Sequence, residues 1–226
     1  SGDGQQFIVM EYVDGVTLRE KIASAKKVDT SPQLPITSAL NYALQIGEAL
    51  QEAHKQGIIH RDIKSDNIMI NQNDQIKVMD FGLAKLKGTL KITKSSSTVG
   101  TLAYMAPEHL QNKDVDARSD IFSFGVLLYE MLTGNLPFEA EYESALMYSI
   151  LNEEPEPAEK YRSDLSSEWL HLLYRALEKD PDSRYQSMTD MLIDLKRLKR
   201  DSSRISRERA EHLPLPPKKR KLSGLF

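Results

Sequence analysis

The sequence predicts a mainly α fold of the α+β class, with one short antiparallel hairpin. Several amphipathic runs separated by glycine or proline have helical spacing, whereas two short apolar runs flank a cluster of turn-forming residues. The chain has 226 residues, of which 40% are hydrophobic and 28% charged, so it can bury one large core. It contains no cysteine, which excludes disulfides and thiolate metal sites and fits a reducing compartment.

The first predicted element is an apolar strand within residues 7–18, and residues 2–6 have the composition of a hairpin turn before it. Residues 38–56 follow as an amphipathic helix, with Gly57 as its stop signal. One side of this helix carries its apolar residues, namely Leu40, Ala43, Leu44, Ile46, Gly47, Leu50 and Ala53.

Further helices are expected in the second half of the chain. Residues 121–132 form the longest apolar run, which is too short to span a bilayer and contains Glu130, so it predicts a buried helix. Residues 144–152, 167–178 and 187–200 are amphipathic, and each begins near a serine that could cap it.

The residues that point to chemistry lie around the predicted hairpin. Residues 68–70 and 76–79 are its strands, and the turn formers of residues 71–74 join them. The octapeptide before it is His60-Arg61-Asp62-Ile63-Lys64-Ser65-Asp66-Asn67, and Asp80-Phe81-Gly82 follows it. Because an antiparallel hairpin brings its outer ends together, we expect Asn67 and Asp80 to lie side by side and to offer oxygens to a hard cation such as Mg²⁺.

These motifs resemble those of the eukaryotic-like protein kinases. The resemblance implies that Asp62 is the catalytic base, which accepts the proton of the substrate hydroxyl, and that Asn67 and Asp80 are the Mg²⁺ ligands. Lys64 matches the Ser/Thr subtype, in which this lysine neutralises the transferred phosphate; tyrosine kinases generally place Ala or Arg there. An aliphatic substrate hydroxyl is therefore expected.

Further landmarks of the family follow in order. Ala106-Pro107-Glu108 matches the end of an activation segment that begins at Asp80, and Thr101 matches the threonine that touches the catalytic Asp and Lys. The structural positions of the family fall on His60, Phe81, Glu108, Asp120 and Arg184. Asp120 would hold the catalytic loop from behind, and Glu108 with Arg184 would form a structural ion pair. This pair argues against a small-molecule kinase of the aminoglycoside or choline type.

Residues 7–18 resemble the last strand of the small lobe and the hinge, and their sequence is similar to that of bacterial PASTA-type Ser/Thr kinases. The resemblance implies that Met10 is the gatekeeper residue and that the backbone of Glu11 and Val13 forms hydrogen bonds with the adenine ring. The implied cofactors are ATP and Mg²⁺, and the remaining cofactor-binding positions are Lys64, Asn67, Met69 and Asp80.

The resemblance covers the large lobe, about residues 5–199, with only one strand of the small lobe. No Gly-rich loop and no lysine-bearing strand precede the hinge in the sequence, so residues 1–226 alone are expected to transfer phosphate negligibly. A non-catalytic kinase-like binding module is the alternative. The complete set of Asp62, Lys64, Asn67 and Asp80 favours the enzyme, because a binding module needs neither a base nor metal ligands.

A polar segment over residues 86–98 is the expected regulatory element. Arg61 immediately precedes the catalytic Asp, and kinases with that arginine commonly use it to bind a phosphate on this loop. A phosphate adds about two negative charges and would pair with Arg61. By position, Thr93 and Ser95 are the expected acceptors.

The predicted kinase domain spans residues 1–200, and residues 201–226 form a basic, proline-containing segment. Residues 196–221 hold eleven Lys or Arg against three acids, an excess of +8 in a chain of net charge −3. A solvated linker, a cytoplasmic juxtamembrane segment before a membrane tether beyond Phe226, and a nuclear-import or nucleic-acid patch all fit this composition. The resemblance favours the first two, so we expect protein substrates, no nucleic acid, and a cytoplasmic location, at the membrane face if tethered.

Overall fold

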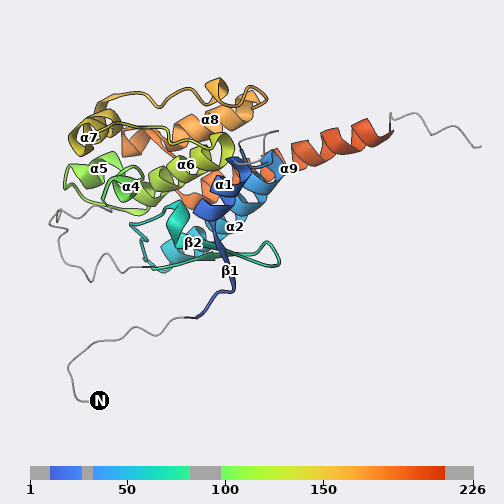
Figure 1. Cartoon of the computed structure of the whole chain (residues 1–226), viewed down its shortest axis with the longest axis horizontal. Coiled ribbons are helices and arrows are strands. Elements are labelled where there is room, and N and C mark those ends of the chain that lie inside the picture. The colour runs from blue at the N-terminus through green and yellow to red at the C-terminus, as the bar shows by residue number, and fades with distance from the viewer. Residues whose placement is uncertain (1–10, 27–32, 82–97, 212–226) are drawn as a thin grey trace, which may run out of the picture.

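Figure 1 shows the computed structural model, which describes residues 11–26, 33–81 and 98–211. Within these ranges the chain is mainly helical with one three-stranded antiparallel sheet, which confirms the predicted mainly α class. Met10, Thr93, Ser95 and the segment 212–226 lie outside the described residues. In Figure 1 the sheet lies at the lower edge of the helical part.

The first strand differs from the expectation. Residues 11–14 have no regular secondary structure, and only β1 (Gly15–Thr17) is a strand. It pairs with the next strand at very close range: a Cβ on Gly15 would lie 2.1 Å from the carbonyl oxygen of Ile70. Any residue other than glycine would therefore push the two strands apart.

Helix α1 (Leu18–Lys26) follows directly, and the sequence analysis missed it. Its start is a capping box, because Glu20 accepts a hydrogen bond from the backbone N–H of Thr17 at 2.8 Å while the Thr17 hydroxyl accepts from the N–H of Glu20. Leu18 and Ile22 are its buried residues. The Thr-x-x-Glu spacing was the signal that could have revealed this helix.

The predicted helix of residues 38–56 is confirmed as α2 (Ile36–Lys55), which begins two residues earlier, directly after Pro35 at its N-cap. Proline suits this end because its missing N–H would have no partner there in any case. Gly57 has a φ of 71°, which is the left-handed conformation that a helix stop requires.

The hairpin is also confirmed, as β2 (Ile68–Asn71) and β3 (Ile76–Val78). The strand order is β1-β2-β3, and Met69 lies opposite both Thr17 and Lys77. The Asn71 side chain accepts hydrogen bonds from the backbone of residues 73 and 75, which closes the turn. A short 3₁₀ turn, η1 (Ser65–Asn67), leads into β2.

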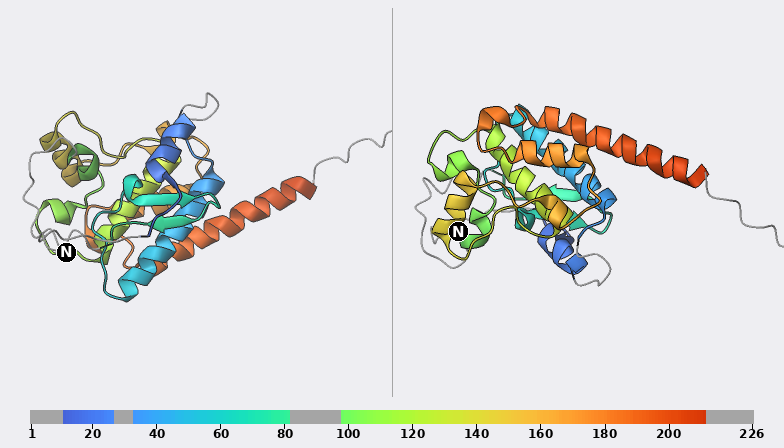
Figure 2. Two further views of the ribbon diagram at one scale, coloured as in Figure 1. Left: turned by 60° about the horizontal axis from the view of Figure 1, so that its bottom comes forward. Right: turned by 90° about the horizontal axis from the view of Figure 1, so that it is seen from above.

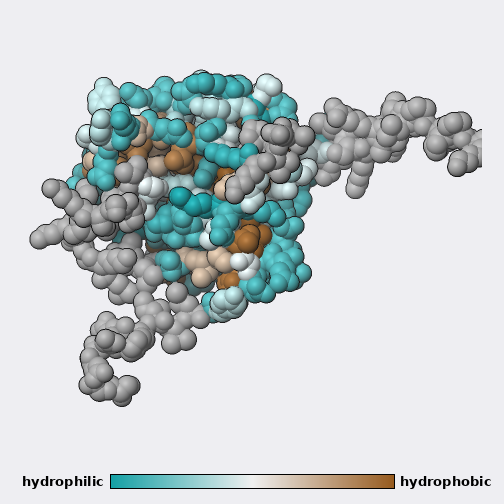
Figure 3. All heavy atoms as spheres, viewed as in Figure 1, coloured by the Kyte–Doolittle hydropathy of each residue, from teal (hydrophilic) through white to brown (hydrophobic). Residues whose placement is uncertain are grey.

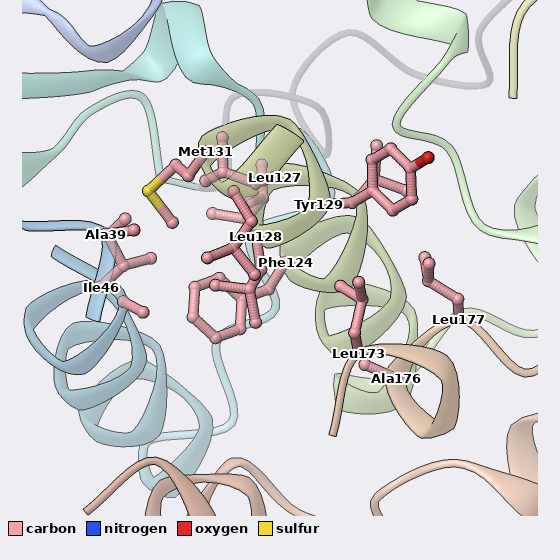
Figure 4. Packing of buried hydrophobic residues seen from close by; sticks show 14 of the residues in the cluster. Ala39, Ile46, Phe124, Leu127, Leu128, Tyr129, Met131, Leu173, Ala176 and Leu177 are labelled. Carbon is pink, nitrogen blue, oxygen red and sulfur yellow. The ribbon is translucent and has the colours of Figure 1, made fainter. Parts of the chain in front are cut away.

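The core is built around α6 (Ala117–Thr133), which is buried on almost all sides, as the apolar run 121–132 predicts. Asp116 caps its start and Gly134, at a φ of 73°, ends it. Figure 4 shows α6 between α2 and α8 (Ser167–Ala176), with Phe124, Leu127 and Leu128 turned toward α2. Two short helices, α4 (Thr98–Leu102) and α5 (Pro107–Leu110), lie before it in the chain.

The remaining elements are α7 (Glu143–Asn152), η2 (Ala158–Lys160), η3 (Pro181–Ser183) and α9 (Met188–Glu211). Serine capping holds only for α9, where Ser187 accepts from the N–H of Asp190. Neither α7 nor α8 has a side-chain hydrogen bond at its N-cap.

The predicted end of the last helix at residue 200 is wrong, because α9 continues to Glu211. No glycine or proline interrupts residues 188–211, so nothing in the sequence stops the helix there. Figure 2 shows its C-terminal half extending beyond the other elements. The helix crosses residue 200, where we expect the kinase domain to end. The position of this domain boundary stays a prediction.

Polar side chains cover most of the face seen in Figure 3, with hydrophobic residues exposed near the sheet. On β1 itself, Val16 is 44% exposed. Within the described residues, no helix is long and apolar enough to cross a bilayer.

Candidate phosphotransfer site

The loop before η1 begins at His60 and is held in place by Asp120 of α6. The side chain of Asp120 is fully buried. Its two carboxylate oxygens accept hydrogen bonds from the backbone N–H groups of His60 and Arg61, each at 2.8 Å. His54 of α2 lies 2.8 Å from the same carboxylate. Arg61 has a φ of 69°, and the bond to Asp120 helps to hold this left-handed backbone.

His60 joins this loop to the segment after β3. Its Nδ1 accepts from the N–H of Asp62 at 3.2 Å, so its Nε2 carries the proton and donates to the carbonyl of Met79 at 2.8 Å. The ring also meets the ring of Phe81 edge-on, at 4.6 Å between centroids. The two predicted motifs are therefore held together by one buried imidazole.

Asp62 is at the centre of the polar cluster. Its Oδ2 accepts from the Lys64 ammonium at 3.0 Å and from the Asn67 amide at 2.9 Å. Its Oδ1 has no hydrogen-bond partner among the described residues, and the side chain is 35% exposed. One oxygen is thus used for positioning while the other remains open to a ligand.

Thr101 of α4, which lies 39 residues after Asp62 in the chain, also contacts this cluster. Its hydroxyl accepts from the Lys64 ammonium at 3.0 Å, so Lys64 bridges Thr101 and Asp62. The expected contact between Thr101 and Asp62 thus runs through the lysine. The side chain of Lys64 is only 15% exposed, so water competes little with these two oxygen acceptors for its ammonium group.

Asn67 and Asp80 occupy the two ends of the hairpin. The N–H of Met79 donates to the carbonyl of Asn67 at 2.8 Å, which places Asp80 one residue from the pairing. Asn67 uses its amide nitrogen for the Asp62 carbonyl and carboxylate, so its Oδ1 is the atom left for a cation. Asp80 has a φ of 60° and makes no ion pair with a described residue. These oxygen donors suit Mg²⁺, which takes one or two protein ligands and completes its shell with water and phosphate.

Within the described ranges, no group of three His, Cys, Asp or Glu side chains gathers as a metal site made of protein side chains alone would require.

The expected adenine-side residues are only partly described. The carboxylate of Glu11 pairs with the exposed Lys77 at 3.0 Å, and Val13 is half-buried. Met69 is half-buried on β2, on the same hairpin as Asn67 and Asp80. Met69 lies two residues after Asn67 in the chain, whereas Met10 lies outside the described residues.

Glu108 and Arg184 form a bidentate pair, with bonds of 2.8 and 2.7 Å. Arg184 is 1% exposed and also donates to three backbone carbonyls, those of residues 118, 178 and 179. Burial opposes the ionisation of Glu108, but hydrogen bonds from Arg184 and Ser119 outweigh it and hold the pKa of Glu108 below its usual value.

Comparison with known proteins places this geometry in a family. The model of the protein kinase domain matches residues 2–194 of the chain. The chain belongs to the protein kinase family. A protein named as a probable serine/threonine kinase from Streptomyces coelicolor is 41% identical over 191 residues, which cover 84% of this chain and 28% of that protein.

The kinase PknB of Mycolicibacterium smegmatis is 40% identical over 194 residues, and PknB of Mycobacterium tuberculosis is 39% identical over 194 residues. Each alignment covers 85% of this chain and 30% of the relative. The chain therefore spans less than a third of the length of the curated relatives it matches. The protein-kinase-like fold class is confirmed by the family match.

One cluster of this kinase fold was missed by the sequence analysis. The Tyr104 hydroxyl donates to Glu130 at 2.5 Å and lies 3.0 Å from the Ser65 hydroxyl, directly behind the loop that carries Lys64. Burial raises the pKa of Glu130 above its usual value. In the sequence, only the position of Glu130 as the single acid of the apolar run 121–132 signalled this cluster, since its partners lie 26 and 65 residues away.

Proposed function

We propose that this chain is the catalytic large lobe of a protein serine/threonine kinase, which transfers the γ-phosphate of ATP to Ser or Thr hydroxyls of proteins. The observation that carries the proposal is the divided use of the Asp62 carboxylate. One oxygen is fixed by Lys64 and Asn67, and the other has no partner among the described residues. A scaffolding acid would have both oxygens satisfied.

In this proposal the free Oδ1 of Asp62 accepts the proton of the substrate hydroxyl as its oxygen attacks the γ-phosphorus. The oxygen–phosphorus bond to the substrate forms, and the bond between the γ-phosphorus and the ADP oxygen breaks. The ammonium of Lys64 lies 3.0 Å from Asp62 Oδ2, where it can offset the negative charge of the transferred group. Thr101 keeps this lysine in place.

The proposed cofactors are ATP and Mg²⁺. Asn67 Oδ1 and the Asp80 carboxylate would hold the ion, with Lys64 on the phosphate side. When bound, Mg²⁺ neutralises phosphate charge and orients the nucleotide. The backbone of Glu11 and Val13, with Met69 and Met10, would bind the adenine side.

A regulatory role is proposed for Arg61. Its Nε is buried without a hydrogen-bond partner among the described residues, although the backbone N–H is bound to Asp120. A phosphate on Thr93 or Ser95 would supply the missing acceptor. Mass spectrometry of the autophosphorylated full-length gene product tests this; modification confined to other residues would remove the assignment.

The proposed partners are protein substrates, with no nucleic acid. The proposed location is the cytoplasm, at the membrane face if sequence beyond Phe226 provides a tether. Fractionation of cells that produce the full-length protein would test both locations.

The function is tested on the full-length product of the gene with labelled ATP and a protein substrate. We expect Mg²⁺-dependent label on Ser and Thr residues, with none on Tyr, and loss of transfer when EDTA removes the ion. Bound protein partners without any transfer would instead support the kinase-like binding module.

A further inference from the structure

Arg162, which follows η2, is a buried cation that lacks part of its hydrogen-bond set. Its side chain is 6% exposed, its Nη2 donates to the carbonyl of Leu34 at 2.8 Å, and its Nη1 is buried without a partner among the described residues. The Asp164 carboxylate lies 3.6 Å from Nε, which is longer than a hydrogen bond. Because arginine stays protonated in proteins, a charge is enclosed here without all of its acceptors.

This guanidinium lies at the start of α2. Its bond to Leu34 ends two residues before Ile36, the first residue of the helix. The N-cap makes no side-chain hydrogen bond, and the backbone N–H groups of Thr37 and Ser38 have no partner among the described residues. The start of a helix attracts anions through such N–H groups and through its dipole. Arg162 adds a full positive charge to that end.

The donors are held in place by the fold and are remote from the phosphotransfer site. Gln33 donates from Nε2 to the carbonyl of Tyr161 at 2.5 Å, so two bonds join chain segments that are 128 residues apart. His54, which contacts Asp120 behind the catalytic loop, lies 18 residues further along α2 than Ile36. At 1.5 Å per residue this separation is about 27 Å.

We propose that Arg162 and the first turn of α2 bind a phosphate group, at a site distinct from the one that transfers phosphate. Nη1 and two helical N–H groups are donors without acceptors, and phosphate offers more charged oxygens to them than a carboxylate does. The phosphate is a free inorganic ion or is carried by a protein side chain, since both present the same oxygens.

The site is closed in this structure by side chains that can move. Thr37, Ser163 and Asp164 are exposed, so the guanidinium lies just below the surface. Asp164 is 71% exposed and competes with a phosphate for the same cation. Its carboxylate can turn to solvent when the phosphate binds, because no hydrogen bond at 3.6 Å holds it.

Calorimetry of the full-length gene product without nucleotide tests the proposal. The probe is inorganic phosphate, with chloride keeping the ionic strength constant. We expect Arg162→Met to bind phosphate about tenfold more weakly, because the charged donor is lost. Asp164→Asn should bind phosphate about threefold more tightly, because a competing negative charge is removed. The second variant leaves the buried guanidinium intact, so it remains informative if Arg162→Met does not fold.

The matched control is Lys160→Met, which removes the same charge two residues away. Lys160 is 59% exposed and pairs with Glu156, so phosphate binding should stay within about twofold of the wild type. A thermal melt of each variant checks that it is folded. Unchanged phosphate binding by folded Arg162→Met, or weaker binding by Asp164→Asn than by the wild type, would overturn the proposal.

A second probe, N-acetyl-O-phosphoserine amide, distinguishes the two sources of phosphate. Tighter binding of this probe than of inorganic phosphate, lost in Arg162→Met, would support a phosphorylated protein side chain. Tighter binding of inorganic phosphate, lost in the same variant, would support the free ion. Acetate that binds as tightly as both would contradict a phosphate site. None of these outcomes depends on phosphate transfer, since no nucleotide is present.

Discussion

Two charged clusters of this kinase lobe use similar residues for different purposes. In the first, Glu108 and Arg184 are 6% and 1% exposed, and both oxygens of Glu108 are bonded to the guanidinium. In the second, Asp62 is 35% exposed and one of its oxygens has no described partner. The comparison teaches that the satisfied cluster fixes geometry, whereas the open oxygen marks where chemistry can occur.

The largest expected effect concerns the satisfied cluster. Arg184→Leu leaves a buried carboxylate and three carbonyls without their donor, so we expect a loss of about 3–5 kcal/mol in the free energy of unfolding. Urea denaturation measures this. The double variant Glu108→Leu/Arg184→Leu should recover only part of the loss, because the three carbonyls stay unpaired. A single variant as stable as the wild type would contradict the structural role.

The next effect concerns Lys64 in the open cluster. Lys64→Met removes the charge that faces the transferred phosphate, so we expect kcat of the full-length enzyme to fall by about tenfold to a thousandfold. Its thermal melting should change little, because the lysine is partly exposed and lies outside the core. A large drop in melting temperature with unchanged kcat would place Lys64 with the scaffold instead.

Gly15→Ala tests the sheet that carries Met69 and directly follows Asn67 in the chain. The added Cβ would lie 2.1 Å from the carbonyl oxygen of Ile70, so β1 must separate from β2. We expect a loss of about 1–3 kcal/mol in unfolding free energy. Val16→Ala, on the same strand but exposed, is the control and should have a much smaller effect.

The smallest effect is a pH dependence. The pKa of Glu108 lies below its usual value, so this carboxyl contributes stability that is present above pH 4.5 and is lost as pH falls through the lowered pKa. In the wild type, unfolding free energy should therefore decrease over that acidic range. In Arg184→Leu the decrease attributable to Glu108 should disappear, and parallel pH profiles of the two proteins would contradict this.

Sequence reasoning reached the open cluster because spacing encodes it. A hairpin with outer ends at Asn67 and Asp80 must bring these residues together, and the structure forms that hairpin. The choice of Asp62 Oδ2 as a shared acceptor could not be read from spacing, since it depends on side-chain rotamers. The Ser65, Tyr104 and Glu130 cluster was hidden for a similar reason, because packing and not local sequence brings it together.

Element boundaries were predicted less well than element types. The predicted end of α9 at residue 200 relied on a change in composition, but helices end at stop signals, and the sequence offers none before residue 211. Helix α1 was missed although its capping box at Thr17 and Glu20 is local. The expected serine caps failed for α7 and α8 because a serine near a helix start is not always oriented toward its N–H groups.

Asp62→Asn tests the central claim most directly, with phosphate transfer by the full-length protein measured per folded molecule beside its thermal melt. General-base catalysis predicts that transfer falls by about a hundredfold to ten-thousandfold while melting changes little. Transfer at the wild-type rate, or a loss that the melt fully explains, would show that Asp62 belongs to the scaffold as Glu108 does.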